Sequence, residues 1–283
     1  MDDTSSPRLV ITTARRPTDE MLARADRWAN WLQAPIIDRR GRSVAALCRD
    51  EKVEGALVLQ ADRTIYFQPT EGIEYFFHPN LASVRIHNLL RGAGDHMINA
   101  MRLQPGDEVL DCTLGRASDA LICAHVVFGQ TPEEADEADD SNTQQGRVVG
   151  IEKVPLLAYL TIDGLQNTSF VSKRFTALMR RIEAYCAGYE EFLAQCSKDS
   201  FDVVYFDPIF HAPVEESQSM EDLRALAHKH PLSTEAVENA LRVARRCVVI
   251  KQRRQTPLWD QLGVTETHGG KQSRVEYGVL PAR

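Results

Sequence analysis

The chain has 283 residues, of which 43% are hydrophobic and 26% are charged, and its formal net charge at pH 7 is −7. This composition is ordinary for a soluble globular protein with one large domain or two modest ones. The chain has no run of about 18 apolar residues, which speaks against a membrane span, and no C-x-x-C pair among its six cysteines, which speaks against a disulfide framework and a metal site. Residues 1–7 are polar and acidic, so we do not expect them to belong to a signal peptide.

Residues 1–80 are predicted to form a small α+β domain. Residues 9–14 have the pattern of a strand, and residues 17–32 that of an amphipathic helix. Residues 55–67 alternate around Ala61-Asp62, which predicts a hairpin. Phe76 to Asn80 marks a break, after which residues 81–103 have a helical pattern with an interruption at Gly92 and Gly94.

From Glu108 onward, short apolar runs alternate with helical segments. The runs are residues 108–112, 148–152, 182–186, 201–207 and 247–251, and the helices are residues 117–128, 154–166, 189–196 and 233–245. Runs spaced in this way predict parallel strands buried on both faces. Two further strands, 264–268 and 275–280, joined by Gly269-Gly270, suit an antiparallel hairpin. We therefore expect residues 81–283 to form an α/β domain with a doubly wound, mostly parallel, seven-stranded Rossmann-like sheet that ends in this hairpin.

Charge is unevenly distributed along the chain. Six acids lie between Thr131 and Asp140, and residues 131–146 are predicted to be a solvated, mobile and dispensable loop. Without this acidic run the rest of the chain is near neutrality. Six bases and no acid lie between Leu241 and Arg254, which predicts a concentrated basic strip.

Ligands of an open α/β sheet bind beyond the carboxyl ends of its strands, so the strand ends contain the candidate site residues. The first strand ends in Asp111, followed by Thr113 and Gly115. A single glycine does not make the G-x-G-x-x-G cradle for a pyrophosphate. Asp111 instead suits a cationic group, such as the sulfonium or amino group of S-adenosylmethionine. The alternative is a tight structural turn with Asp119 as a helix cap.

The next two strand ends offer candidate contacts to a nucleoside. Glu152, at the end of the second strand, can accept hydrogen bonds from both ribose hydroxyls, although it is also compatible with a plain surface acid. Ala187 and Gly188 follow the third strand and can lie against an adenine ring, or they can form a simple turn before a helix.

The fourth and fifth strand ends contain the candidate catalytic and substrate-binding groups. Asp207 is followed by Pro208, which restricts the backbone, and then by Phe210, which can stack on a flat ring. Lys251, Arg253 and Arg254 follow the fifth strand, where they can hold phosphates. The alternative for Asp207 and Pro208 is a mere turn, and the alternative for the three bases is a solvated charged loop.

Taken together, these segments resemble the class I S-adenosylmethionine-dependent methyltransferases over residues 76–283. They are most similar to the small-subunit ribosomal RNA guanine-N2 methyltransferases, whose fourth-strand motif is Asp-Pro-Met-Phe, and to bacterial homologues of that family. The matching segments are residues 111–115 with 118–119, 151–153, 205–210 and 244–251.

The resemblance implies a role for each matching residue. Ser118 and Asp119 would line the cofactor pocket, and Glu152 and Lys153 would lie at the ribose. Ala187 and Gly188 would border the adenine, and Asp207 would lie between cofactor and target base. Two positions depart from the family pattern, because Ala117 replaces a second glycine and Ile209 replaces methionine. The segment Pro208-Ile209-Phe210 also differs from the Pro-Pro-Tyr core of adenine-N6 enzymes, which disfavours adenine as the target.

We therefore expect a cytoplasmic enzyme that uses S-adenosylmethionine to methylate a guanine exocyclic amine, with ribosomal RNA of the small subunit as partner and with no metal. A methyltransferase for a small-molecule or protein amine, a homologue that binds the cofactor or RNA without catalysis, and a nicotinamide enzyme remain the alternatives.

Overall fold

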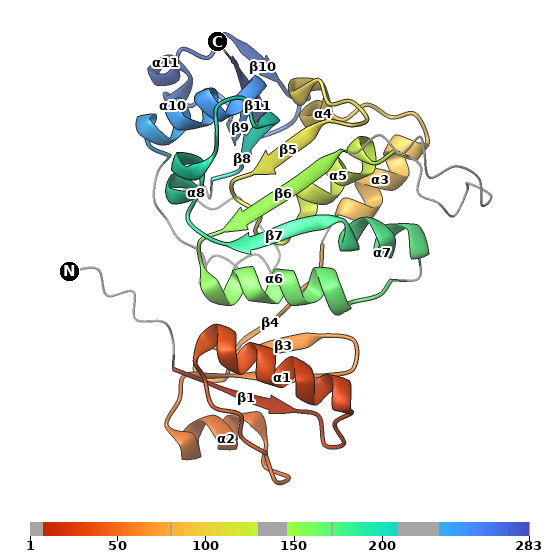
Figure 1. Cartoon of the computed structure of the whole chain (residues 1–283), viewed down its shortest axis with the longest axis vertical. Coiled ribbons are helices and arrows are strands. Elements are labelled where there is room, and N and C mark those ends of the chain that lie inside the picture. Colours follow the sequence, from red (N-terminus) through yellow and green to blue (C-terminus); the bar gives the residue numbers. More distant parts are fainter. Residues whose placement is uncertain (1–7, 80, 130–145, 171, 209–231, 283) are drawn as a thin grey trace. The chain divides into compact units, whose positions relative to one another are not determined.

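The computed structural model describes residues 8–79, 81–129, 146–170, 172–208 and 232–282 (Figure 1). These residues form two compact units. The first unit contains the described residues up to His78 together with Tyr159–Ser169, and the second contains the others. The predicted acidic loop, apart from Gly146, and the predicted stacking residue Phe210 lie outside the described residues.

The first unit contains a four-stranded sheet in the order β1-β2-β3-β4. Its strands are β1 (Leu9–Thr13), β2 (Gly55–Leu59), β3 (Thr64–Gln68) and β4 (Ile73–Phe76), and its helices include α1 (Asp19–Leu32) and α2 (Val44–Glu51). β1 and β2 are parallel, whereas β2 and β3 form the predicted antiparallel hairpin. The predicted first strand and first helix are confirmed, with Thr18 as the helix cap. Helix α2 and strand β4 were not predicted.

A buried ion pair holds part of this unit together. Arg24 of α1 is 1% exposed and its guanidinium donates to Asp163 at 2.7 Å, to the Thr64 hydroxyl at 3.0 Å and to the Gln60 carbonyl at 2.9 Å. Asp163 belongs to helix α6 (Pro155–Asn167), of which the part from Tyr159 on lies in this unit. Because its donors are satisfied by oxygen atoms, a buried arginine is tolerated here.

The second unit contains a seven-stranded sheet in the order β10-β11-β9-β8-β5-β6-β7. Its strands are β5 (Glu108–Asp111), β6 (Arg147–Glu152), β7 (Ile182–Cys186), β8 (Phe201–Phe206), β9 (Ala244–Arg253), β10 (Glu266–His268) and β11 (Val275–Pro281). The first five pair in parallel, and β11 pairs antiparallel with both β9 and β10. The predicted fold class, including the C-terminal antiparallel hairpin, is confirmed.

Apart from the start of α6, the helices among the described residues of this unit are α3 (Ala82–Leu90), α4 (His96–Met101), α5 (Ser118–Val127), α7 (Lys173–Arg180), α8 (Tyr189–Gln195), α10 (Thr234–Val243) and α11 (Leu258–Leu262). The predicted interruption near Gly92 separates α3 from α4. The predicted helix 233–245 ends earlier, at Val243, because Ala244 already pairs with Phe201 in the sheet. Helices α7 and α11 were not predicted.

The alternation of side chains along the central strands decides which residues at their carboxyl ends meet the start of α5. Val204 of β8 and Ile250 of β9 lie in the hydrophobic core that α8 and α10 cover. Tyr205 and Lys251 are the next residues and therefore point to the opposite face. There both side chains contact Asp119 in the first turn of α5. The polar groups near the carboxyl ends of β8 and β9 thus meet the start of α5.

Candidate functional site

The register of the sheet brings three predicted site residues to one edge. Asp111 ends β5 opposite Tyr205 of β8, and Phe206 of β8 lies opposite Ile250 of β9. Asp207 and Lys251 are each one residue further along, so the two side chains are neighbours. The Lys251 Nζ donates to Asp207 Oδ2 at 2.7 Å. Strand pairing therefore assembles the acid of the Asp-Pro motif with a base that the sequence places 44 residues away.

The turn after β5 is organised around Thr113. Its main-chain N–H donates to Asp111 Oδ1 at 3.0 Å, and its hydroxyl oxygen accepts from the Asp207 main-chain N–H at 2.6 Å. Gly115 and Ala117 both have positive φ, at 49° and 58°. Glycine adopts this region freely, whereas alanine pays about 1–2 kcal/mol. Ala117 therefore keeps the left-handed geometry at the position where the resembling family has glycine.

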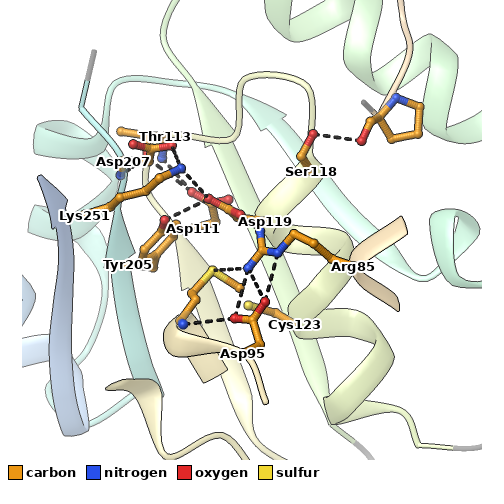
Figure 2. A network of polar contacts seen from close by, with 12 residues as sticks. Arg85, Asp95, Asp111, Thr113, Ser118, Asp119, Cys123, Tyr205, Asp207 and Lys251 are labelled. Carbon is orange, nitrogen blue, oxygen red and sulfur yellow. Dashed lines mark hydrogen bonds and ion pairs between the residues drawn. The ribbon is translucent and has the colours of Figure 1, made fainter. Parts of the chain in front are cut away.

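Asp119 is the centre of the polar network shown in Figure 2. Its Oδ1 accepts a hydrogen bond from Arg85 of α3, and its Oδ2 accepts from the Tyr205 hydroxyl at 2.8 Å and from Lys251 at 3.3 Å. The Asp119 side chain is only 11% exposed. Three donors thus occupy the carboxylate that the resemblance assigns to the cofactor pocket.

Arg85 and Asp95 complete this network and were missed from the sequence. The Arg85 guanidinium contacts both carboxylate oxygens of Asp95, at 2.9 and 3.0 Å. Asp95 also caps α4 by accepting from the Met97 main-chain N–H at 2.9 Å. An aspartate just before a helix is a recognisable capping signal. Nothing in the local sequence distinguishes Arg85 from a solvated arginine.

The acids of this network have strongly different pKa values. Burial raises the pKa of Asp111, which is 2% exposed, to about 8, and the neighbouring Asp119 and Asp207 add to the shift. Burial alone would also raise the pKa of Asp119, but Lys251 and Arg85 bring it down to about 2. The pKa of Asp207 is raised by burial, against the opposing effect of Lys251. A neutral Asp111 thus lies beside an ionised Asp119 at neutral pH.

Glu152 connects the turn after β5 with the end of β6. Its Oε2 accepts from the Gly115 main-chain N–H at 3.2 Å and its Oε1 from the Val154 main-chain N–H at 2.9 Å. The Lys153 main-chain N–H is a further donor to this carboxylate, which with about four lone pairs can accept one more hydrogen bond, such as that of a ribose hydroxyl. Lys153 is exposed at the same strand end. Ser118 donates its hydroxyl to the Pro79 carbonyl at 2.9 Å, so that predicted cofactor residue is engaged within the protein.

The first turn of α8, which follows β7, contains a further residue that was missed, Glu190. The Ala187 main-chain N–H donates to the Glu152 carbonyl at 3.0 Å, and Gly188 caps α8, where a Cβ atom would lie 2.1 Å from Glu191 Oε2. Glu190 follows, and its Oε2 is buried without a hydrogen-bond partner among the described residues. Because a buried carboxylate oxygen without a donor is costly, Glu190 Oε2 is a candidate acceptor for an N–H or O–H group.

The predicted basic strip is divided between the two ends of β9, contrary to our expectation of one concentrated patch. At the amino end, Arg245 binds Asp202 and Arg246 binds Asp107. At the carboxyl end, Arg253 belongs to the strand itself, and Arg254 donates to the carbonyls of Gly269 and Lys271 at 3.4 Å. Arg246 and Arg253 are seven residues apart along the strand, which at 3.3 Å per residue separates the two groups by roughly 23 Å. Three predicted substrate-binding residues, Lys251, Arg253 and Arg254, thus lie at the carboxyl end.

The described part of the chain contains neither a candidate metal site nor a helix that could span a membrane. Within residues 8–79, 81–129, 146–170, 172–208 and 232–282, no three histidine, cysteine or acidic side chains are arranged to hold a metal ion. In the same residues, no helix has the length and apolar character needed to cross a bilayer.

Comparisons with known proteins identify the family of the chain and relatives of its fold. Residues 144–278 match the family model SAM_MT, described as "Putative SAM-dependent methyltransferase". The chain is 34% identical to the protein YpiP of Bacillus subtilis (strain 168), over 96% of this chain and 98% of that protein. It is 25% identical to Ribosomal RNA small subunit methyltransferase J of Marinobacter nauticus, over 68% of this chain and 64% of that protein.

Among solved structures, the fold is similar to that of a SAM-dependent methyltransferase from Neisseria gonorrhoeae. The TM-score is 0.61 at 14% sequence identity, and the match covers 96% of each chain.

Proposed function

Because the chain belongs to the family of the Bacillus subtilis protein YpiP and is an S-adenosylmethionine-dependent methyltransferase, we propose that it methylates the exocyclic amine of a guanine in small-subunit ribosomal RNA. The observation that carries this proposal is the setting of Asp207. Its main-chain N–H is held by Thr113 and its Oδ2 by Lys251, whereas its Oδ1 has no partner among the described residues. An acceptor fixed in this way suits an N–H donor.

The strand ends fit the cofactor. S-adenosylmethionine supplies a methyl group that its sulfonium already activates. Asp111 would face a cationic group of the cofactor, and Glu152 would accept from the ribose hydroxyls. Glu190 would accept from the exocyclic amine of the adenine beside Ala187, because its buried Oε2 is otherwise without a donor in the described chain.

The protein's own contribution is to align the acceptor and to raise its nucleophilicity. An exocyclic guanine amine is a weak nucleophile because its lone pair is delocalised into the ring. Donation of one N–H to Asp207 Oδ1 would increase the electron density on nitrogen and hold the lone pair toward the methyl group. The nitrogen must then lose a proton, for which the Asp207 carboxylate is the nearest acceptor in this arrangement. Phe210, predicted to stack on a base turned out of its helix, lies outside the described residues.

The resemblance of the Asp-Pro segment and the similarity to a small-subunit methyltransferase support ribosomal RNA as the partner. The test is to incubate the protein with labelled S-adenosylmethionine and undermethylated small subunits and then to map the label. We expect label on a guanine N2. Label that enters no RNA, while the cofactor still binds, would contradict the proposal.

Asp207 is tested in the same assay. We expect Asp207→Ala to lower turnover about 100-fold with cofactor affinity unchanged, because it removes a bond needed in the transition state. Asp207→Asn keeps an oxygen acceptor and should retain part of the activity. Asp260 is exposed on α11, so Asp260→Ala is the matched control and should behave as the unchanged protein. A folded Asp207→Ala protein with full activity would remove Asp207 from the mechanism.

A second candidate function is methylation of a small-molecule or protein amine. The division of the bases along β9 favours it, since Arg245 and Arg246 are engaged in ion pairs and are not available to an RNA backbone. Changing Arg253 and Arg254 to Ala separates the two candidates. An RNA enzyme should lose affinity and show a flatter salt dependence, because fewer counterions are released. An unchanged salt dependence would favour the small substrate.

A further inference from the structure

The ammonium group of Lys251 lies between two carboxylates. It is 2.7 Å from Asp207 Oδ2 and 3.3 Å from Asp119 Oδ2, and the Lys251 side chain is 21% exposed (Figure 2). An ammonium has three N–H donors, and two of them are directed into the protein. A lysine that binds a phosphate of the substrate would instead direct its charge outward.

Asp119 is a rigid anchor for this lysine. Its Oδ1 is bound to Arg85, which is itself held by Asp95, and its Oδ2 is also bound to the Tyr205 hydroxyl. Although burial opposes ionisation, Lys251 and Arg85 keep the pKa of Asp119 at about 2. Asp119 is therefore a permanent counter-ion, fixed from three different elements of the fold.

Asp207 is held from two sides by this arrangement. Thr113 fixes its main chain, and Lys251 fixes one oxygen of its carboxylate. Rotation of the carboxylate would break the short contact to Lys251, so the second oxygen is held in one direction. A 2.7 Å contact between an ammonium and a carboxylate is charge-assisted and directional.

We propose that Lys251 is a positioning residue, held by Asp119, which fixes the Asp207 carboxylate so that its second oxygen receives the N–H of the methyl acceptor. The inference rests on the proposed function, which it deepens by assigning Lys251 to the acid of the Asp-Pro motif instead of to a substrate phosphate.

Three variants test this role. Lys251→Met removes the charge and keeps the length of the side chain. Lys251→Arg keeps the charge, and Lys198→Met changes an exposed lysine as the matched control.

The first measurement needs no substrate. In protein labelled with ¹³C-aspartate, the Asp207 carboxyl resonance is identified by its loss in Asp207→Asn, and its titration gives the pKa of Asp207. We expect Lys251→Met to raise this pKa by about one pH unit or more, and Lys251→Arg and Lys198→Met to leave it in place. The other charged or titratable groups near Asp207 or Lys251 are unchanged in these variants; they are Asp111, Asp119, Arg85, Tyr205 and Tyr277. An unmoved Asp207 titration in Lys251→Met would overturn the proposal.

The second measurement is kinetic. We expect Lys251→Met to lower kcat about tenfold or more, with KM for the RNA and the cofactor Kd within about twofold of the unchanged protein. Lys251→Arg should recover part of kcat, because it can still bridge the two carboxylates. A raised KM with unchanged kcat would show that Lys251 binds the substrate and would overturn the inference. If the unchanged protein transfers no methyl group to RNA, the proposed function fails, and the titration still decides the role of Lys251.

Discussion

Replacement of Asp111 by Asn tests whether a neutral carboxyl group lies at the centre of the site. The pKa of Asp111 is raised from 3.8 to about 8, chiefly by burial. The folded state therefore keeps a proton that the unfolded chain releases. The stabilisation of the folded state by this bound proton is fully present below pH 4, near the pKa of Asp111 in the unfolded chain. It is lost as the pH rises toward 8, the pKa of Asp111 in the folded protein. Over this window each pH unit costs about 1.4 kcal/mol of the free energy of unfolding.

Asn cannot ionise, but its side-chain oxygen can still accept from the Thr113 main-chain N–H, which Asp111 binds at 3.0 Å. The unfolding free energy of Asp111→Asn should therefore lack this pH dependence. Between pH 5 and pH 7 we expect the variant to gain about 2–3 kcal/mol relative to the unchanged protein. Urea titrations of both proteins at several pH values measure this difference, in which the contributions of titrating groups that do not interact with Asp111 cancel. Parallel stability curves from pH 5 to pH 8 would refute a protonated Asp111.

The same proton should respond to the cofactor. If Asp111 faces a cationic group of S-adenosylmethionine, the bound cation favours the ionised carboxylate, so binding at pH 7 should release up to about one proton. Calorimetry in buffers of different ionisation enthalpy counts this proton. Asp111→Asn should abolish the release. Binding without proton exchange in the unchanged protein would place the cationic group elsewhere.

Three further predictions concern the first unit and the first turn of α8. Asp163→Ala should lower the unfolding free energy by about 3–5 kcal/mol in a urea titration, because it leaves the buried charge of Arg24 without its partner; a loss below about 1 kcal/mol would mean that water replaces the carboxylate. Gly164→Ala should cost about 1–3 kcal/mol in thermal unfolding, since its Cβ would lie 2.1 Å from the ring of Phe77, and an unchanged Tm would contradict this packing. Glu190→Ala should weaken S-adenosylmethionine binding about tenfold or more by calorimetry, whereas unchanged affinity would leave its buried oxygen unexplained.

Much of the second unit could be predicted from the sequence because its signals are local. Apolar runs such as Val203 to Phe206 are continuous when a strand is buried on both faces, and Gly269-Gly270 between two short strands favours a hairpin. The positions of Asp111, Glu152 and Asp207 at strand ends follow from where these runs stop. Parallel strands present their carboxyl ends at one edge, so their convergence is a property of the fold class.

The partners of these residues were decided only by the tertiary structure. Lys251 has the sequence context of a phosphate-binding base, but the pairing of β8 with β9 places it beside Asp207, and α5 adds Asp119. Arg85 reaches Asp119 from a helix 34 residues earlier. A side chain carries no local mark of the charge that it will meet across a sheet or from another helix, because that meeting depends on strand order and register. The sequence therefore determined which groups reach the edge of the sheet, and the packing of the strands and α3 and α5 determined which of them neutralise one another.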